Sequence, residues 1–271
     1  MTIIDKGIGV MRRMSPAAVL VTINVAVFVA LRLAAIVIRF GYSGISTDSL
    51  VSALVMPRSA EAWLQAPWTA ITYMFVQYDP LHLLMNMLWL YMFGSILGGF
   101  VSARRVFALY VTGGLCGAAG YLIANSVPSS FSGTVGLTGA SASILAIMSA
   151  AMILRPKMRL RLVLFGDASL KVVGLIAVLL VIIATGTGNY GTHAAHAGGF
   201  FAGVAFALLD SMVKKVPARS MAAGGVPGSE PCQDTLDELL DKIRRSGFSS
   251  LTPDERSRLI SLSSNLQKRK Q

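Results

Sequence analysis

Charged residues, and acidic residues above all, are scarce in this sequence. Only 14% of the 271 residues are charged, and 24 Lys and Arg stand against 13 Asp and Glu. Soluble globular domains carry about 25% charged residues and about 45–50% apolar ones. Here 54% of the residues are hydrophobic, and they gather in long runs separated by short polar stretches. The composition excludes an ordinary soluble domain and predicts helices buried in a lipid bilayer.

Cysteine is almost absent as well. The chain has two, Cys116 within an apolar run and Cys232 near the C-terminal end. This pair forms neither a disulfide framework nor a metal-binding spacing. The cysteines therefore predict no metal site.

The net charge of +11 raises the question of nucleic-acid binding. The basic residues, however, lie in short clusters beside the apolar runs, where they determine membrane topology. We therefore expect the lipid bilayer, and no nucleic acid, as the partner of this charge.

Six apolar runs have about the length that a membrane-spanning helix requires, which is roughly 20 residues. They lie near 17–39, 81–100, 106–125, 137–154, 171–187 and 192–213. A signal peptide is an alternative for the first run, but that run is longer than a signal core and lacks a clear cleavage site. The predicted fold is all-α, a polytopic membrane helix bundle of six transmembrane helices spanning 17–213.

Positive charge lies on alternate sides of these runs. The basic clusters occupy 12–13, 104–105, 155–171 and 214–219, whereas 126–136 and 188–191 carry no charge. Because Lys and Arg mark cytoplasmic loops, the N-terminal segment 1–16 and the C-terminus are predicted to be cytoplasmic. The second, fourth and sixth runs then all begin on the outer side.

The C-terminal region changes in composition. Residues 214–233 are rich in small and turn-forming residues and are predicted to be a linker. In residues 234–271, apolar residues recur at helical spacing with one interruption. This pattern predicts two short helices, a small cytoplasmic helical hairpin. Thr252 and Glu255 form the pattern of a capping box at the start of its second helix.

Four polar residues within the runs stand out, because polar side chains in a membrane are costly and usually functional. His82 and Asn86 lie four apart on one face of the second run. Ser141 lies about four residues into the fourth run, and His196 lies equally far into the sixth. All four should meet at similar depth near the outer side. His193, closer to the surface, is interpreted as solvated.

These residues suit nucleophilic catalysis. A serine hydroxyl needs an adjacent base, and a neutral imidazole can take its proton and later return it. The amide of Asn86 and the ring of His82 can stabilise an oxyanion beside backbone N–H groups, including that of Ser141. Since no acidic residue lies in the outer half of these runs, the predicted machinery is a dyad of Ser141 and His196.

Glycines predict how the helices approach. Gly139 precedes the serine by two residues, and Gly199 and Gly203 form a small-residue stripe on the face of His196. Such a stripe lets two membrane helices come close together.

Three segments resemble the motifs of rhomboid intramembrane proteases of the bacterial type. GASA at 139–142 resembles their GxSG motif, HLLMN at 82–86 their HxxxN motif, and AHAGGFFAG at 195–203 their AHxxGxxxG motif. The resemblance covers about 17–213. It implies a serine endopeptidase of the bacterial inner membrane that cleaves single-span membrane proteins near the outer face without a cofactor.

The same resemblance implies a role for each matching residue. Ser141 would be the nucleophile and His196 the general base, with His82 and Asn86 stabilising the oxyanion. Two packing positions depart from the family pattern. Ala142 replaces the second glycine of GxSG, and Leu145 stands where the family often has an aromatic residue packed under the histidine.

Two other functions remain open from the sequence. A catalytically inactive rhomboid-like protein that binds transmembrane segments is suggested by Ala142 and Leu145. A small-solute transporter would also contain intramembrane polar residues, although these would be spread through the depth of the bilayer.

Overall fold

The structure is a computed structural model of the chain. It describes residues 14–41, 47–127, 136–162, 166–186, 189–215, 242–243, 251–252, 254–257 and 259. The chain divides into two compact units, Met1–Lys215 and Val216–Gln271. The predicted linker, the loop 126–136 and most of the C-terminal hairpin lie largely outside the described residues, as does most of the N-terminal segment 1–16.

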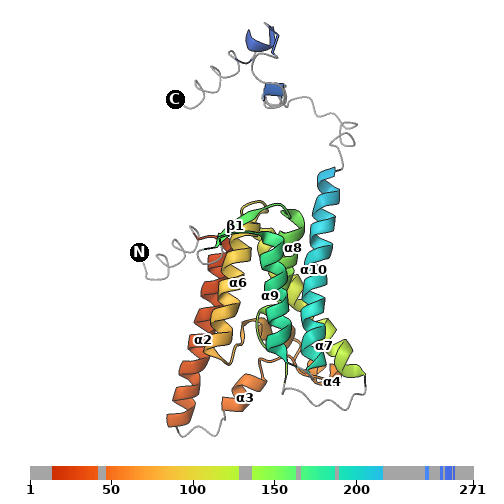
Figure 1. The fold of residues 1–271 in the computed structure, drawn as a ribbon. Helices are drawn as coiled ribbons and strands as arrows, with labels where there is room; N and C mark the ends of the chain where they lie inside the picture. The colour runs from red at the N-terminus through yellow and green to blue at the C-terminus, as the bar shows by residue number, and fades with distance from the viewer. Residues whose placement is uncertain are drawn as a thin grey trace, which may run out of the picture. The chain divides into compact units, whose positions relative to one another are not determined.

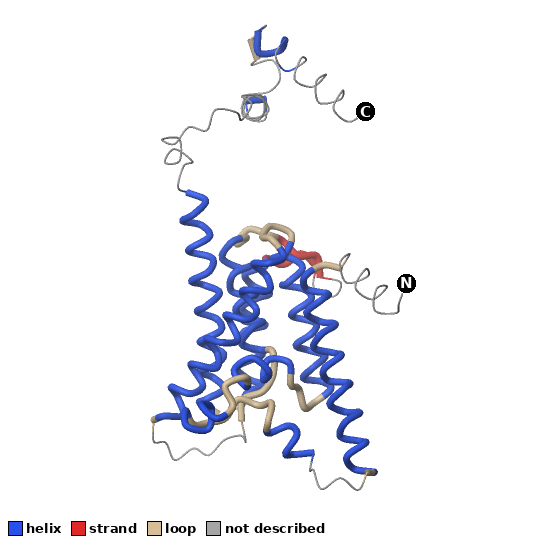
Figure 2. Tube along the Cα trace, turned by 180° about the vertical axis from the view of Figure 1, so that it is seen from behind, coloured by secondary structure: helices blue, strands red, loops and turns tan. Residues whose placement is uncertain are grey.

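The first unit is a helical bundle, so the prediction of a helical membrane bundle is confirmed. Six helices run roughly alongside one another and alternate in direction (Figures 1 and 2). They are α2 (Pro16–Phe40), α6 (Pro80–Gly98), α7 (Ala103–Ser126), α8 (Ser141–Leu154), α9 (Leu170–Thr185) and α10 (Tyr190–Lys215).

Among the described residues, four helices are long and apolar enough to cross a membrane: α2, α6, α7 and α10. The other two, α8 and α9, have 14 and 16 residues. The prediction of a fourth helix from about 137 was wrong at its start, because residues 137–140 are not helical. Gly139 there has a φ of +100°, a left-handed conformation that an α-helix cannot contain.

The helices begin where the sequence supplies capping groups. The hydroxyl of Ser15 accepts a hydrogen bond from the N–H of Ala18, and Pro16 occupies the first turn of α2. The carboxylate of Asp79 accepts the N–H of His82 at 2.6 Å, and Pro80 opens α6 in the same way. The cap at Asp79 thus marks the start of α6 and places His82 in its first turn.

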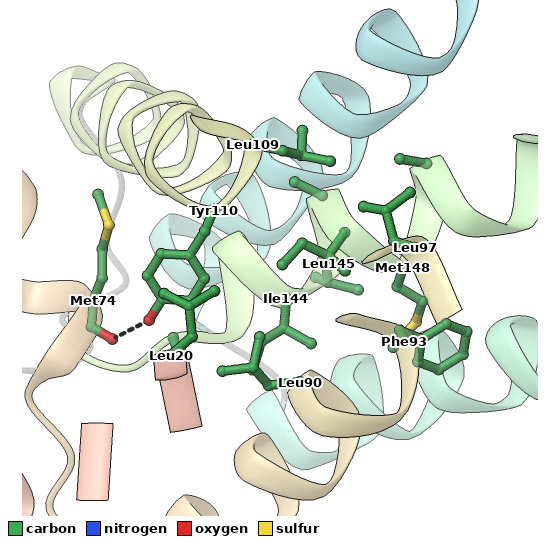
Figure 3. Close-up of a cluster of buried hydrophobic side chains, with 14 of the residues drawn as sticks. Leu20, Met74, Leu90, Phe93, Leu97, Leu109, Tyr110, Ile144, Leu145 and Met148 are labelled. Atoms are coloured by element: carbon green, nitrogen blue, oxygen red, sulfur yellow. Dashed lines mark hydrogen bonds between the residues drawn. The ribbon is translucent and has the colours of Figure 1, made fainter. Parts of the chain in front are cut away.

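Helix α8 lies inside the bundle and packs against α6, α7 and α10. Most of its side chains are buried, among them Ile144, Leu145 and Met148. These meet buried residues of neighbouring helices, including Leu90 and Leu109, in the cluster of Figure 3. A central helix that is apolar on all sides is expected when neighbours rather than lipid surround it.

Asn24 is a polar residue buried on α2 among apolar side chains, and its amide is hydrogen-bonded. It donates a hydrogen bond to the hydroxyl of Tyr110 at 3.1 Å. This hydroxyl donates in turn to the carbonyl of Met74 at 3.2 Å, the bond that is drawn in Figure 3. The three residues connect α2, α7 and the segment before α6. Buried polar groups are retained where they are paired in this way.

Arg32 is one of two arginines within the first predicted span, 17–39. Its guanidinium lies over the ring of Phe28, 5.1 Å from the centroid, and hydrogen-bonds to the carbonyl of Tyr78. The charge therefore has local partners, as intramembrane charges generally do.

The connections contain more structure than the sequence predicted. Short helices α3 (Thr47–Ser52), α4 (Ala60–Gln65), α5 (Thr69–Thr72) and the 3-10 helix η1 (Tyr73–Phe75) lie between α2 and α6. The all-α prediction also missed an antiparallel hairpin of β1 (Arg159–Leu162) and β2 (Gly166–Ser169). The alternation of Arg and Leu at 159–162 has the period of a strand and is the signal that could have revealed it. The hairpin lies at the opposite end of the bundle from α3 and α4 (Figures 1 and 2).

In the second unit, the predicted capping box is present. The N–H of Thr252 donates to the carboxylate of Glu255 at 2.8 Å, and the N–H of Glu255 donates to the Thr252 hydroxyl at 3.3 Å. Lys242 also hydrogen-bonds to this carboxylate, and these contacts lower the pKa of Glu255 to about 2.

Candidate active site

Ser141 and His196 form the centre of the site. The Oγ of Ser141, on α8, lies 2.7 Å from Nε2 of His196, on α10. The two side chains are 55 residues apart in sequence, and their exposed fractions are only 8% and 7%. A hydroxyl and an imidazole at this distance can exchange a proton.

Ser141 is the first residue of α8, not four residues inside a helix as the sequence suggested. The N–H groups in the first turn of an α-helix have no carbonyl partner within that helix. They also carry the positive end of the helix dipole. At this corrected position, the serine hydroxyl lies beside backbone N–H groups that remain free to donate. Within the interior of a helix, these groups would already bond to carbonyls of the preceding turn.

The turn before Ser141 is held by the segment between α2 and α6. Leu137 and Met56 exchange two backbone hydrogen bonds, of 2.9 and 3.1 Å, and the N–H of Gly139 donates to the carbonyl of Tyr73 at 3.0 Å. The Tyr73 hydroxyl in turn donates to the carbonyl of Gly114 on α7, at 2.7 Å. No spacing in the sequence indicated that this connecting segment would anchor the nucleophile.

His82 and Asn86 face the same turn. A methyl group on Gly139 would lie 3.2 Å from Cε1 of His82 and 3.8 Å from Nδ2 of Asn86. One N–H of the Asn86 amide donates to Oε1 of Gln77 at 2.9 Å, which leaves its second N–H for another acceptor. Gln77, itself buried, was not singled out from the sequence.

Glycines bring α10 onto α8. A methyl group on Gly199 would collide with the backbone of Ala142, and one on Gly203 would collide with the backbone of Ala146. The helices therefore touch backbone to backbone along this stripe. His196 lies one turn before Gly199 on the same face, so this approach carries the imidazole toward Ser141.

Comparison with known families identifies the chain. The model of the Rhomboid domain matches residues 64–213, more than half of the sequence. The chain belongs to the rhomboid family. No curated protein matches it in sequence. The match contains all four polar residues of the site, and the family together with the apolar helices makes this a multi-pass membrane protein.

This rhomboid accommodates Ala142, its departure from the family motif, through a glycine on α7. The side chain of Ala142 is buried, and a methyl group on Gly117 would lie only 2.6 Å from its Cβ. In the family motif the residue without a side chain is on α8; here the alanine is on α8 and the glycine that faces it, Gly117, is on α7.

Gly117→Ala should therefore destabilise the bundle by about 1–3 kcal/mol, the usual cost of overpacking. Ala142→Gly in the same chain should recover part of the loss; the rest remains because the new methyl also lies 3.0 Å from the Tyr73 hydroxyl. Unfolding in detergent of the wild type, both single variants and the double variant measures the coupling. Equal destabilisation by Gly117→Ala with and without Ala142→Gly would contradict this account.

Leu145 does not replace the missing aromatic residue. It points into the apolar cluster with Leu109 and Met148 (Figure 3). The second ring nitrogen of His196, Nδ1, lies instead 3.3 Å from the hydroxyl of Thr185, at the end of α9. Sequence reasoning missed Thr185, since an ordinary threonine at the end of an apolar helix gives no signal.

His193 also has a partner, so its interpretation as a solvated side chain was incomplete. Its Nε2–H donates to the carbonyl of Gly186 at 2.9 Å. Among the described residues, no cluster of three His, Cys, Asp or Glu side chains could hold a metal ion.

Proposed function

We propose that this rhomboid is a serine endopeptidase that cleaves membrane-spanning proteins with a Ser141–His196 dyad. The observation that carries the proposal is the 2.7 Å contact between Oγ of Ser141 and Nε2 of His196. An unpaired serine in a membrane helix usually bonds its own helix backbone, whereas here the hydroxyl meets a base from another helix.

In the first half of the reaction, the Oγ of Ser141 attacks the scissile carbonyl carbon while Nε2 of His196 takes the hydroxyl proton. The tetrahedral intermediate then collapses, the C–N bond breaks, and His196 returns the proton to the leaving amine. The product is an ester between Ser141 and the N-terminal part of the substrate. In the second half, water attacks this ester with His196 again as base, which releases the carboxylate and restores the serine.

The oxyanion of the intermediate needs donors held in place beforehand. The N–H of Ser141 at the start of α8, the second N–H of Asn86 and the ring of His82 are the groups that would supply them. Their supporting contacts are the Gln77 bond to Asn86 and the Asp79 cap on the α6 backbone.

All six helices are proposed to lie in the membrane, with α8 and α9 shorter than its full thickness. The basic residues Arg155, Lys157 and Arg159 lie at the end of the bundle where α8 stops, and Ser141 lies at the other end of α8. By the positive-inside rule, the site would open toward the outer side and both termini would be cytoplasmic. The inner membrane of a bacterium is the proposed location.

The proposed substrates are single-span membrane proteins. An intact helix keeps its carbonyls hydrogen-bonded, so cleavage requires a segment that unwinds near the outer face. Small or helix-breaking residues at that depth would supply such a segment.

A fluorophosphonate probe tests the nucleophile without any knowledge of the substrate. The serine oxygen displaces fluoride from phosphorus, which leaves a stable phosphonate ester on an activated serine. The full chain in detergent should be labelled, and mass spectrometry should find the adduct on Ser141. Ser141→Ala should abolish labelling. Failure of the wild type to react would favour the inactive, segment-binding alternative.

A further inference from the structure

We propose that Thr185 is a positioning residue that holds His196 in the tautomer needed to accept the serine proton. This inference rests on the proposed function. In a neutral imidazole, one nitrogen carries the proton and the other accepts, and the partner of the first nitrogen selects the tautomer. His196 must accept at Nε2, which faces Ser141, so its proton must reside on Nδ1, which faces Thr185.

The hydrogen bonds of Thr185 determine the direction of its contact with Nδ1. Its hydroxyl donates to the carbonyl of Val181, one turn earlier on α9, at 2.8 Å. A hydroxyl has a single hydrogen, and this shorter bond uses it. Toward Nδ1, at 3.3 Å, the oxygen can then only accept, so the imidazole carries its proton on Nδ1. Within the described part of the chain, Thr185 is the hydrogen-bonding group at that nitrogen.

The end of α9 is well placed for this role. The Nε2–H of His193 donates to the carbonyl of Gly186, the residue after Thr185, at 2.9 Å. His193 and His196 are three residues apart on α10 and so share a face. Two contacts from one face of α10 therefore hold the last turn of α9, although much of the rest of α9 is exposed and apolar.

The arrangement also compensates for Leu145. An aromatic ring under the histidine would restrain the plane of the imidazole, and Leu145 turns away into the apolar cluster. A hydroxyl at Nδ1 restrains the ring by a hydrogen bond instead of by stacking. The restraint is neutral, and among the described residues the histidine has no acidic hydrogen-bond partner.

The test compares Thr185→Val, which keeps the shape and removes the hydroxyl, with Thr185→Ser, which keeps the hydroxyl. Thr112→Val on α7 is the matched control, because its hydroxyl makes the same bond one turn back, to Ala108 at 2.8 Å, without a histidine partner. One readout is the rate of fluorophosphonate labelling. The other is the ¹⁵N NMR spectrum of the imidazole nitrogens. The signals of His196 are assigned as those that disappear in His196→Ala.

Thr185→Val should label about three- to tenfold more slowly, as expected for one neutral hydrogen bond. In a proteolysis assay the fall should be in kcat, with KM unchanged. The His196 spectrum should shift from the Nδ1-protonated form toward the other tautomer. Thr185→Ser and Thr112→Val should behave as the wild type.

Two results would overturn the proposal. One is a ¹⁵N spectrum of Thr185→Val in which His196 is still protonated on Nδ1. The other is a Thr185→Ser protein that loses as much activity as Thr185→Val. That result would mean that the methyl group of Thr185, through its packing, and not its hydroxyl, supports activity. The tautomer spectrum does not depend on activity. If the wild type fails to react with the probe, the proposed function fails while the role of Thr185 is still decided.

Discussion

Ser141→Ala, or His196→Ala, should lower the rate of cleavage of a single-span membrane substrate by about 10⁴-fold or more, as in other serine hydrolases. Either change removes one side of the 2.7 Å contact between the proposed nucleophile and its base. Because the two residues act as one unit, the double variant should be no slower than either single one. The measurement is product formation by the full chain in liposomes.

Ser143→Ala is the matched control for this experiment. Ser143 is buried on the same helix two residues later, and its hydroxyl has no hydrogen-bond partner in the described part of the chain. Its removal should leave cleavage unchanged. Cleavage that survives Ser141→Ala would exclude Ser141 as the nucleophile.

Gly199→Ala should lower kcat by about 10²-fold, the loss that a displacement of a catalytic group by about 1 Å can cause. The added methyl would collide with the carbonyl oxygen of Ala142 and lie 2.7 Å from its carbonyl carbon and 2.9 Å from its Cα. Backbone atoms of a buried helix cannot turn aside as a flexible side chain can. Helix α10 must therefore move away from α8, and it takes His196 with it. Fluorophosphonate labelling of Ser141 should fall together with proteolysis.

Gly98→Ala provides the control for a methyl added to a glycine in this bundle. At that position the methyl would lie 3.8 Å from the ring of Pro16, an ordinary van der Waals distance. This variant should retain both stability and labelling. Unchanged labelling in Gly199→Ala would mean that the close approach of the two helices does not position His196.

The pattern of apolar residues along the sequence predicted most of the membrane helices, but it did not predict where the helix of the nucleophile begins. The apolar runs predicted α2, α6, α7 and α10 closely, because burial in lipid depends on composition along a single segment. The start of α8 could not be predicted in this way. It depends on Gly139 and on backbone hydrogen bonds of the preceding turn with Met56 and Tyr73, which are distant in sequence.

The sequence by itself determined the membrane environment, the rhomboid motifs and the residue types at the site, and it predicts the direction of the helices. Those properties follow from composition, charge placement and spacing, which are local. Only the tertiary structure decided that Ser141 begins its helix, that Gly117 makes room for Ala142, and that Thr185 meets the far side of His196. Each of these is a contact between separate helices, and such contacts depend on how packed surfaces fit together in three dimensions.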